Sequence, residues 1–178
     1  MSKYGVIAIA GRPNVGKSTL MNHLIGFKVS ATANKPQTTR HNIRGILSED
    51  DCQVVFLDTP GIHRSSKSLL NKTINLQAVA ALEDVDAVIM IVEAERWEDE
   101  DSLVLERLQH LTCPVFLVAN KVDRVRQKSD LLAWLQKVAA KREFKAIFPL
   151  SATKAINTDE LKRELLAIIP EGDWAYAE

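Results

Sequence analysis

The residues best suited to chemistry are 11–18, which read GRPNVGKS. They match the pattern G-x-x-x-x-G-K-[ST], in which glycines let backbone N–H groups turn inward around an anion and the dipole of a following helix adds positive potential. Lys17 would reach the outer phosphates of a nucleotide, and the Ser18 hydroxyl would bind Mg²⁺. A glycine-rich turn with a surface lysine is the alternative, but a strand before the loop and a helix after it favour phosphate binding. The residues expected to bind phosphate are Asn14, Val15, Gly16, Lys17, Ser18 and Thr19.

A second polar segment, residues 120–123, reads NKVD and bears on the choice of base. An ionised Asp123 offers two acceptor oxygens and no donor, so it pairs with the imino and amino N–H groups of guanine but meets an acceptor at N1 of adenine. Asn120 would hold the neighbouring loop and the base edge, and the stem of Lys121 would lie against the base plane. Alone, the segment could equally be a salt-bridged loop; together with the phosphate loop it predicts GTP over ATP. A further base-binding segment is expected at Ser151, Ala152 and Thr153.

Two segments are placed to read the γ-phosphate. The apolar residues 54–57 lead into Asp58, which can hold Mg²⁺ through water, and Gly61 follows with an N–H that can face the γ-phosphate. Residues 36–40 read PQTTR in a loop of roughly 15 residues, and loops of that length without structure are usually functional. We expect Thr39 to complete the Mg²⁺ shell, with Thr38 as the alternative and an ordinary solvated loop as the other interpretation. The expected metal ligands are Ser18, Thr39 and Asp58.

Short β-branched runs that alternate with stretches of helical period predict an α/β fold with a mostly parallel sheet. A polar turn at residues 48–51 is too short for a crossover helix, so the two strands beside it should form an antiparallel hairpin. One apolar stripe is expected on the fourth helix, formed by Leu131, Leu132, Leu135, Val138 and Ala139. Six strands are expected at 6–10, 43–47, 54–57, 87–92, 115–119 and 147–150, and five helices at 18–25, 69–82, 98–111, 129–141 and 159–168.

Length and composition limit the class of protein. The chain has 178 residues, about one domain at ~150 residues per domain, with 46% apolar and 26% charged residues, which excludes disordered, collagen-like and coiled-coil proteins. Lys plus Arg and Asp plus Glu are 23 each, which disfavours a generally basic nucleic-acid binder. Cys52 and Cys113 form no C-x-x-C pattern, so we expect neither a disulfide framework nor a zinc site, and a cytosolic setting. We expect no signal peptide or membrane span, because the apolar runs are too short.

In their order and spacing these motifs resemble the five signature motifs of translation-factor-class GTPases. The segments QTTRH at 37–41, DTPGIH at 58–63 and VEAERW at 92–97 are similar to the branch that acts in bacterial small-subunit ribosome assembly. The resemblance covers essentially the whole chain. It implies a three-layer P-loop NTPase fold, GTP hydrolysis to GDP and phosphate with Mg²⁺, and loops that the γ-phosphate orders and hydrolysis releases.

The position after Gly61 complicates the mechanism, because many small GTPases carry there a Gln that orients the attacking water. Here the residue is Ile62, which has no hydrogen-bonding group. The resemblance implies K⁺ activation instead, with the amide oxygen of Asn14 holding K⁺ at the phosphates; alternatively, Asn14 only caps its own turn. The expected catalytic residues are Asn14, Lys17, Thr39 and Gly61, whereas Arg40, His41, Arg44 and His63 are interpreted as solvated or partner-facing.

The resemblance also implies partners. They are guanine nucleotide and the small ribosomal subunit with its rRNA, bound mainly through a KH-type RNA-binding domain that follows the GTPase domain in that branch. A monomeric, cytoplasmic protein with peripheral association at the inner face of the cell membrane is expected. Residues 1–170 should form the GTPase domain, and residues 171–178, which lack a clear period, should be a loose tail or the start of a linker toward the absent KH-type domain.

Two other functions stay open at this point. One is a non-hydrolysing, GTP-dependent binding module, because Ile62 removes the usual water-positioning group. The other is the GTPase domain of a tRNA-modification enzyme, a family that shares the Asn14 and threonine-loop features.

Overall fold

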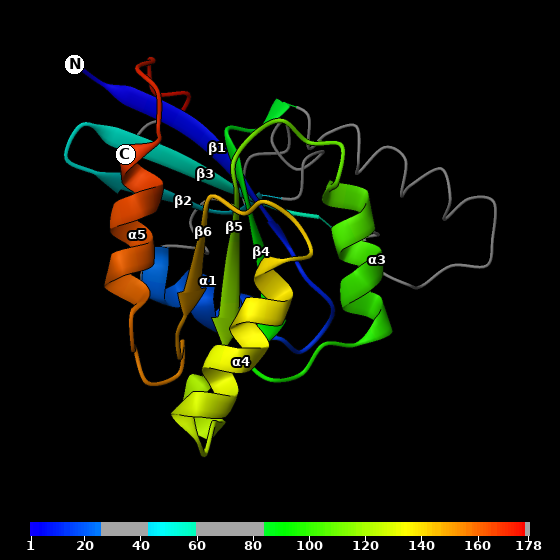
Figure 1. Ribbon diagram of the computed structural model, residues 1–178. Coiled ribbons are helices and arrows are strands. Elements are labelled where there is room, and N and C mark those ends of the chain that lie inside the picture. The colour runs from blue at the N-terminus through cyan, green and yellow to red at the C-terminus, as the bar shows by residue number, and fades with distance from the viewer. Residues whose placement is uncertain (26–42, 60–83, 177–178) are drawn as a thin grey trace.

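A computed structural model of the chain describes residues 1–25, 43–59 and 84–176. Within these ranges six strands form one sheet in the order β2-β3-β1-β4-β5-β6 (Figure 1). Strand β2 pairs antiparallel with β3, and every other neighbouring pair is parallel, so the expected mostly parallel sheet with one hairpin is confirmed. The strands are β1 (Lys3–Ala10), β2 (Ile43–Glu49), β3 (Cys52–Asp58), β4 (Ala87–Glu93), β5 (Val115–Asn120) and β6 (Ala146–Pro149).

Helices cover both faces of this sheet and make a three-layer structure (Figure 1). The expected helix at residues 69–82 lies outside the described residues. No helix in the described ranges combines the length and apolar character that crossing a membrane would require. The described helices are α1 (Lys17–Ile25), α3 (Asp99–Leu108), the 3₁₀ turn η4 (Val122–Arg124), α4 (Lys128–Ala139) and α5 (Thr158–Ala167).

Alternation along each strand divides the interior into two apolar clusters. In β1, Ile7 and Ile9 face one cluster, whereas Ala8 and Ala10 face the other, as the two-residue period of a strand requires. Helices α1 and α5 complete the first cluster, and α3 and α4 complete the second. Because the central strands are buried on both faces, their sequences are continuous apolar runs.

The apolar stripe expected on α4 is partly wrong. Val138 is buried and Trp134 packs against the same cluster, but Leu132 is 53% exposed and Ala139 is also exposed. Leu131 and Leu135 fall on the Val138 row at four- and three-residue steps, whereas Leu132 lies one residue on, about 100° around the helix. Helix α3 is also shorter than expected, because it ends at Leu108.

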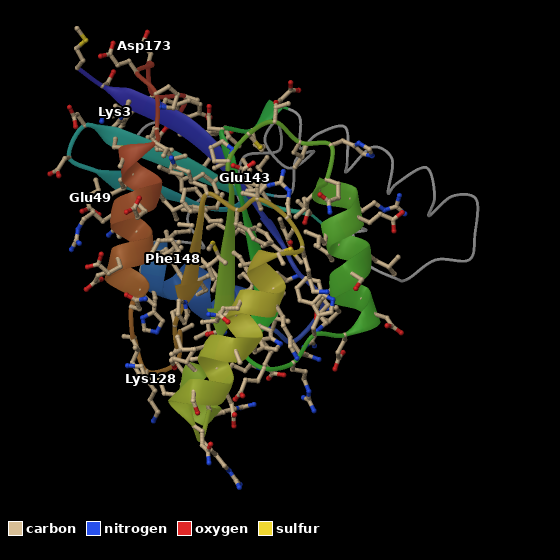
Figure 2. All side chains as sticks on the ribbon, viewed as in Figure 1. Lys3, Glu49, Lys128, Glu143, Phe148 and Asp173 are labelled. Carbon is tan, nitrogen blue, oxygen red and sulfur yellow. The ribbon has the colours of Figure 1, made fainter. Side chains whose placement is uncertain are left out.

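The segment after Pro170 is not a loose tail in the described residues. Glu171 bridges to Lys3 at the start of β1, and the Trp174 Nε1–H donates to the backbone oxygen of Asp51 at 3.2 Å. Figure 2 shows Lys3 and Asp173 at the end of the molecule away from Lys128. The segment therefore lies at the edge where the parallel strands begin.

A buried glutamine fixes the far end of this segment. Gln53, which is fully buried in β3, donates through Nε2 to the Tyr176 backbone oxygen at 2.9 Å and accepts from the Tyr176 N–H at 3.1 Å. The pairing satisfies both ends of an amide that would be costly to bury alone. Trp174 and Tyr176 therefore both hydrogen-bond to the β2–β3 hairpin.

Candidate nucleotide-binding site

The parallel topology brings the polar segments of the sequence to one edge of the sheet. The carboxyl ends of β1, β3, β4 and β5 lie side by side, as the register of Ile9 with Asp58 and of Glu93 with Asn120 shows. In open α/β sheets ligands bind at this edge. A cavity of about 470 Å³ lies here, which is within the range of small-molecule sites. Its lining includes Asn14, Gly16, Lys17, Ser18, Thr19, Arg44, Asn120, Lys121 and Thr153.

The phosphate loop joins β1 to α1 as expected. Lys17 is the first residue of α1, and its Nζ donates to the Gly11 backbone oxygen at 2.8 Å, which holds the ammonium over the loop. Burial lowers the pKa of Lys17, and the positive charge of Arg44 adds to this, while Asp58 opposes it. A partly desolvated cation inside a loop of backbone N–H groups suits a polyphosphate.

Gly16 can only be glycine at this point of the loop. Its φ is +102°, which L side chains rarely adopt, and an added Cβ would lie 2.2 Å from Asn120 Nδ2. The phosphate loop and the segment after β5 are therefore in direct contact.

Asn120 connects three segments of the site. Its Nδ2 donates to the Val15 backbone oxygen at 2.8 Å, and its Oδ1 accepts from the Ala152 N–H at 3.0 Å. The side chain is almost fully buried. The loop-holding part of the role expected for Asn120 is therefore present in the geometry, and the contact with a base edge stays a prediction.

Lys121 makes the second connection between the base and phosphate segments. Its φ is +69°, and its Nζ donates to the Asn14 backbone oxygen at 2.9 Å while it pairs with Glu93 Oε1, also at 2.9 Å. The ammonium of Lys121 is thus fixed by Asn14 and Glu93. The aliphatic stem of Lys121 therefore runs from the NKVD segment to the phosphate loop, and its contact with a base plane stays a prediction.

Asp123 lies in η4 and is exposed to solvent. Its Oδ1 accepts a hydrogen bond from Ser151 Oγ at 2.7 Å, and this bond is the main reason that the pKa of Asp123 is lowered. Ser151 is itself fully buried. An oriented, ionised carboxylate of this kind offers acceptors to two neighbouring N–H groups, as guanine requires.

Ser18 and Asp58, the two expected Mg²⁺ ligands that the structure describes, both contact the guanidinium of Arg44. Arg44 donates from Nη1 to Ser18 Oγ at 3.2 Å and lies with Nε 3.4 Å from Asp58 Oδ2. A hydroxyl and a carboxylate around one positive group are the oxygen donors that Mg²⁺ prefers, so these residues fit the metal. Thr38, Thr39 and Gly61 lie outside the described residues. The interpretation of Arg44 as a solvated or partner-facing side chain is wrong, because its guanidinium belongs to the site.

Comparison with known proteins agrees with this geometry. The model of the 50S ribosome-binding GTPase family matches residues 6–121. The chain belongs to this family. The GTPase Era of Ectopseudomonas mendocina is 47% identical over 178 residues, covering 100% of this chain and 60% of the relative, and that of Pseudomonas aeruginosa is 46% identical over 177 residues, covering 99% and 58%. The chain thus spans about 60% of the length of these relatives.

Solved structures of the family have the same fold. Era in complex with MgGDPNP and nucleotides 1506–1542 of 16S ribosomal RNA matches with a TM-score of 0.81 at 36% identity, covering 99% of this chain and 60% of that one. A single-residue variant of Aquifex aeolicus Era bound to GDP·AlF₄⁻ matches with a TM-score of 0.79, also at 36% identity, covering 98% and 60%. The GTPase resemblance and the fold class expected from the sequence are confirmed.

An ionic network that no sequence pattern predicted lies behind the phosphate loop. Arg12 is nearly buried and contacts Asp101 Oδ2 at 3.1 Å, Glu98 Oε2 at 3.6 Å and Glu93 Oε2 at 3.7 Å. Asp101, in the first turn of α3, is fully buried. Burial raises the pKa of its carboxyl, although the hydrogen bond from the Glu98 N–H and the charge of Arg12 act to lower it. Arg12 occupies a variable position of the motif, so no local pattern indicated its partners.

Glu93, at the end of β4, is the centre of this network. It is 8% exposed and contacts Arg12, Lys121, Arg96 and Arg124. Burial alone would raise the pKa of Glu93, but hydrogen bonds and charge from Lys121 and Arg96 outweigh it, so the pKa is lowered. Glu93 therefore positions the cation that spans the base and phosphate segments.

Replacement of Glu93 by Gln should lower the free energy of unfolding by about 2 kcal/mol at pH 7, because the neutral amide no longer balances the charges of Arg12 and Lys121 at this point of the network. Folding lowers the pKa of Glu93 from its ordinary value of 4.5. The ionised carboxylate therefore stabilises the folded protein fully above pH 4.5, and this stabilisation is lost as the pH falls through the pKa of the folded state. The difference between the two proteins should therefore shrink at acid pH. Urea titrations at pH 7 and about pH 4 test this, with the exposed Glu160→Gln on α5 as control. An equal loss at both pH values would contradict the prediction.

Proposed function

We propose that this chain binds GTP and GDP with Mg²⁺, hydrolyses GTP to GDP and phosphate, and acts as a switch in assembly of the small ribosomal subunit. One observation carries the proposal: Asn120 and Lys121 join the guanine-type segment to the phosphate loop through Val15 and Asn14. A ligand with both a guanine base and a polyphosphate is the molecule that would contact the two joined loops at once.

In this proposal each segment has a separate task. Asp123, oriented by Ser151, selects guanine, while the phosphate loop and Lys17 neutralise the phosphates. Ser18 and Asp58 hold Mg²⁺, together with Thr39 or, alternatively, Thr38. Bound Mg²⁺ supplies charge neutralisation at the β- and γ-phosphate oxygens. The N–H of Gly61 senses the γ-phosphate, whose loss releases the loops that carry Thr39 and Gly61.

The hydrolysis step is proposed to depend on Asn14. Because Ile62 cannot orient water, added positive charge at the phosphates is the remaining means of stabilising the transition state. Asn14 lines the cavity, and its φ of +68° is a conformation that Asn tolerates better than most residues. Its amide oxygen would hold K⁺ there, and K⁺ would supply the charge that an arginine supplies in other GTPases.

Partners and location are proposed from the relatives. The solved Era complex contains part of 16S ribosomal RNA, and the curated Era relatives are longer than this chain. We infer that contact with rRNA is made mainly through a KH-type domain, with residues 1–170 as the GTPase domain and 171–178 leading toward it. The family resemblance of the sequence motifs is the basis for proposing a monomeric, cytoplasmic protein with peripheral association at the inner membrane face.

The test is turnover by the purified chain in K⁺ and in Na⁺ at matched ionic strength, with ATP as control. We expect GTP hydrolysis over multiple turnovers, faster in K⁺, and no hydrolysis of ATP. Absence of turnover in both salts with intact GTP binding would favour a non-hydrolysing binding module. A normal rate in both salts would keep the GTPase and remove the K⁺ role.

A further inference from the structure

Arg44 lies at an irregularity of the β2–β3 hairpin. Ile43 is paired with Leu57 and Gly45 with Phe56, so Arg44 is an extra residue on β2. Such bulges bend a strand and re-aim a side chain, and they are common next to active sites. Here the bulge immediately precedes the buried Gly45 and lies opposite the end of β3, where Asp58 follows Leu57.

The guanidinium of Arg44 contacts both described residues that fit Mg²⁺. Nη1 donates to Ser18 Oγ at 3.2 Å, and Nε lies 3.4 Å from Asp58 Oδ2. The side chains of Arg44 and Asp58 are 30% and 28% exposed, so the pair is partly shielded from solvent. Asp58 Oδ1 already accepts from the Thr59 N–H at 2.9 Å. Oδ2 is the carboxylate oxygen that forms the ion pair with Arg44.

We propose that Arg44 competes with Mg²⁺ for Ser18 and Asp58 and thereby weakens the Mg²⁺ affinity of the nucleotide complex. This rests on the proposed binding of guanine nucleotide. In the proposed complex Mg²⁺ would be held by the Ser18 hydroxyl and, through water, by the Asp58 carboxylate. A guanidinium that is hydrogen-bonded to Ser18 and ion-paired with Asp58 would be a like charge a few ångströms from the metal. Metal binding must therefore displace Arg44.

Removing the guanidinium should leave Ser18 and Asp58 more available to the metal. The effect should be moderate, because partly exposed ion pairs are weak; we expect roughly a three- to tenfold change in the half-saturating Mg²⁺ concentration.

The experiment measures mant-GDP dissociation from the purified chain as a function of free Mg²⁺ at constant ionic strength. Wild type, Arg44→Met and Arg44→Gln are compared, with Arg163→Met as a control that removes an exposed arginine of α5. Both Arg44 variants should need about three- to tenfold less Mg²⁺ than wild type, and the control should match wild type. Thermal unfolding of the nucleotide-free proteins in EDTA is the second readout, and both Arg44 variants should have a lower midpoint, since the guanidinium then no longer joins β2, Asp58 and α1.

The outcomes separate this inference from the proposed function. Mg²⁺-dependent binding with an equal or higher Mg²⁺ requirement in both Arg44 variants would overturn the role of Arg44 and leave the proposed function intact. Wild-type protein that binds no mant-GDP would overturn the proposed function, and this inference with it.

Discussion

Asp123→Asn should lower the affinity for GTP about a hundredfold or more and create affinity for xanthosine triphosphate. The carboxylate offers acceptors to two N–H groups of guanine, and each unpaired polar group in such a site costs about 1–3 kcal/mol. The amide of Asn keeps one acceptor oxygen and replaces the other with an NH₂ donor. This donor would face the amino group of guanine, which is also a donor, but it would pair with the 2-oxo group of xanthine. Ser151 can still donate to the remaining oxygen, so the side chain should keep its orientation.

Competition against mant-GDP with GTP, xanthosine triphosphate and ATP measures this change. Asp130→Asn is the matched control, because Asp130 is an exposed carboxylate in the first turn of the adjacent helix α4. Acid pH should act in the same direction as the variant, since protonation removes an acceptor from Asp123, although its lowered pKa delays this. Retained GTP affinity without any gain for the xanthine nucleotide would refute the guanine contact.

Asn14→Gly should reduce GTP turnover in K⁺ at least tenfold and bring the rates in K⁺ and Na⁺ together. The proposed charge at the phosphates replaces one that is worth ~10³–10⁵ in rate where an arginine supplies it. Glycine is the right replacement because the φ of Asn14 is +68°, which alanine would occupy only with strain. The backbone oxygen that Lys121 contacts is kept, so nucleotide affinity should change little.

Asn14→Asp serves as the matched variant because it retains a side-chain oxygen and tolerates the left-handed conformation. It should preserve a larger ratio of K⁺ to Na⁺ rates than Asn14→Gly does. Steady-state phosphate release in the two salts, with mant-GDP affinity measured in parallel, provides the test. A K⁺ preference that survives Asn14→Gly would exclude Asn14 as the ligand.

The sequence predicted the elements that carry local patterns. The apolar runs expected at 6–10, 54–57 and 115–119 lie in β1, β3 and β5, and each leads into a polar motif. The edge at which these motifs meet followed from parallel topology. Boundaries were less accurate: α3 ends three residues before the expected position, because the apolar period continues to Leu111 although the helix does not. Apolar periodicity indicates which residues face a core, not where the backbone leaves the helix.

Contacts between distant segments were not predictable in this way. Arg12 and Asp101 meet only because β1 and β4 are neighbours in the sheet, and each residue by itself resembles an ordinary exposed charge. The docking of residues 171–176 likewise depends on a buried glutamine in β3 that has no distinguishing sequence context. No periodicity, fixed spacing or motif in the sequence indicates either contact.

The sequence alone therefore determined the chemistry of the phosphate and base segments, because consecutive residues fix backbone shape and donor or acceptor type over a short span. Only the tertiary structure decided how those segments are held together: the bulge that directs Arg44 to Ser18 and Asp58, and the network in which Glu93 fixes Lys121. Long-range ionic contacts depend on which strands are adjacent and where each side chain is aimed, and these are properties of the folded sheet.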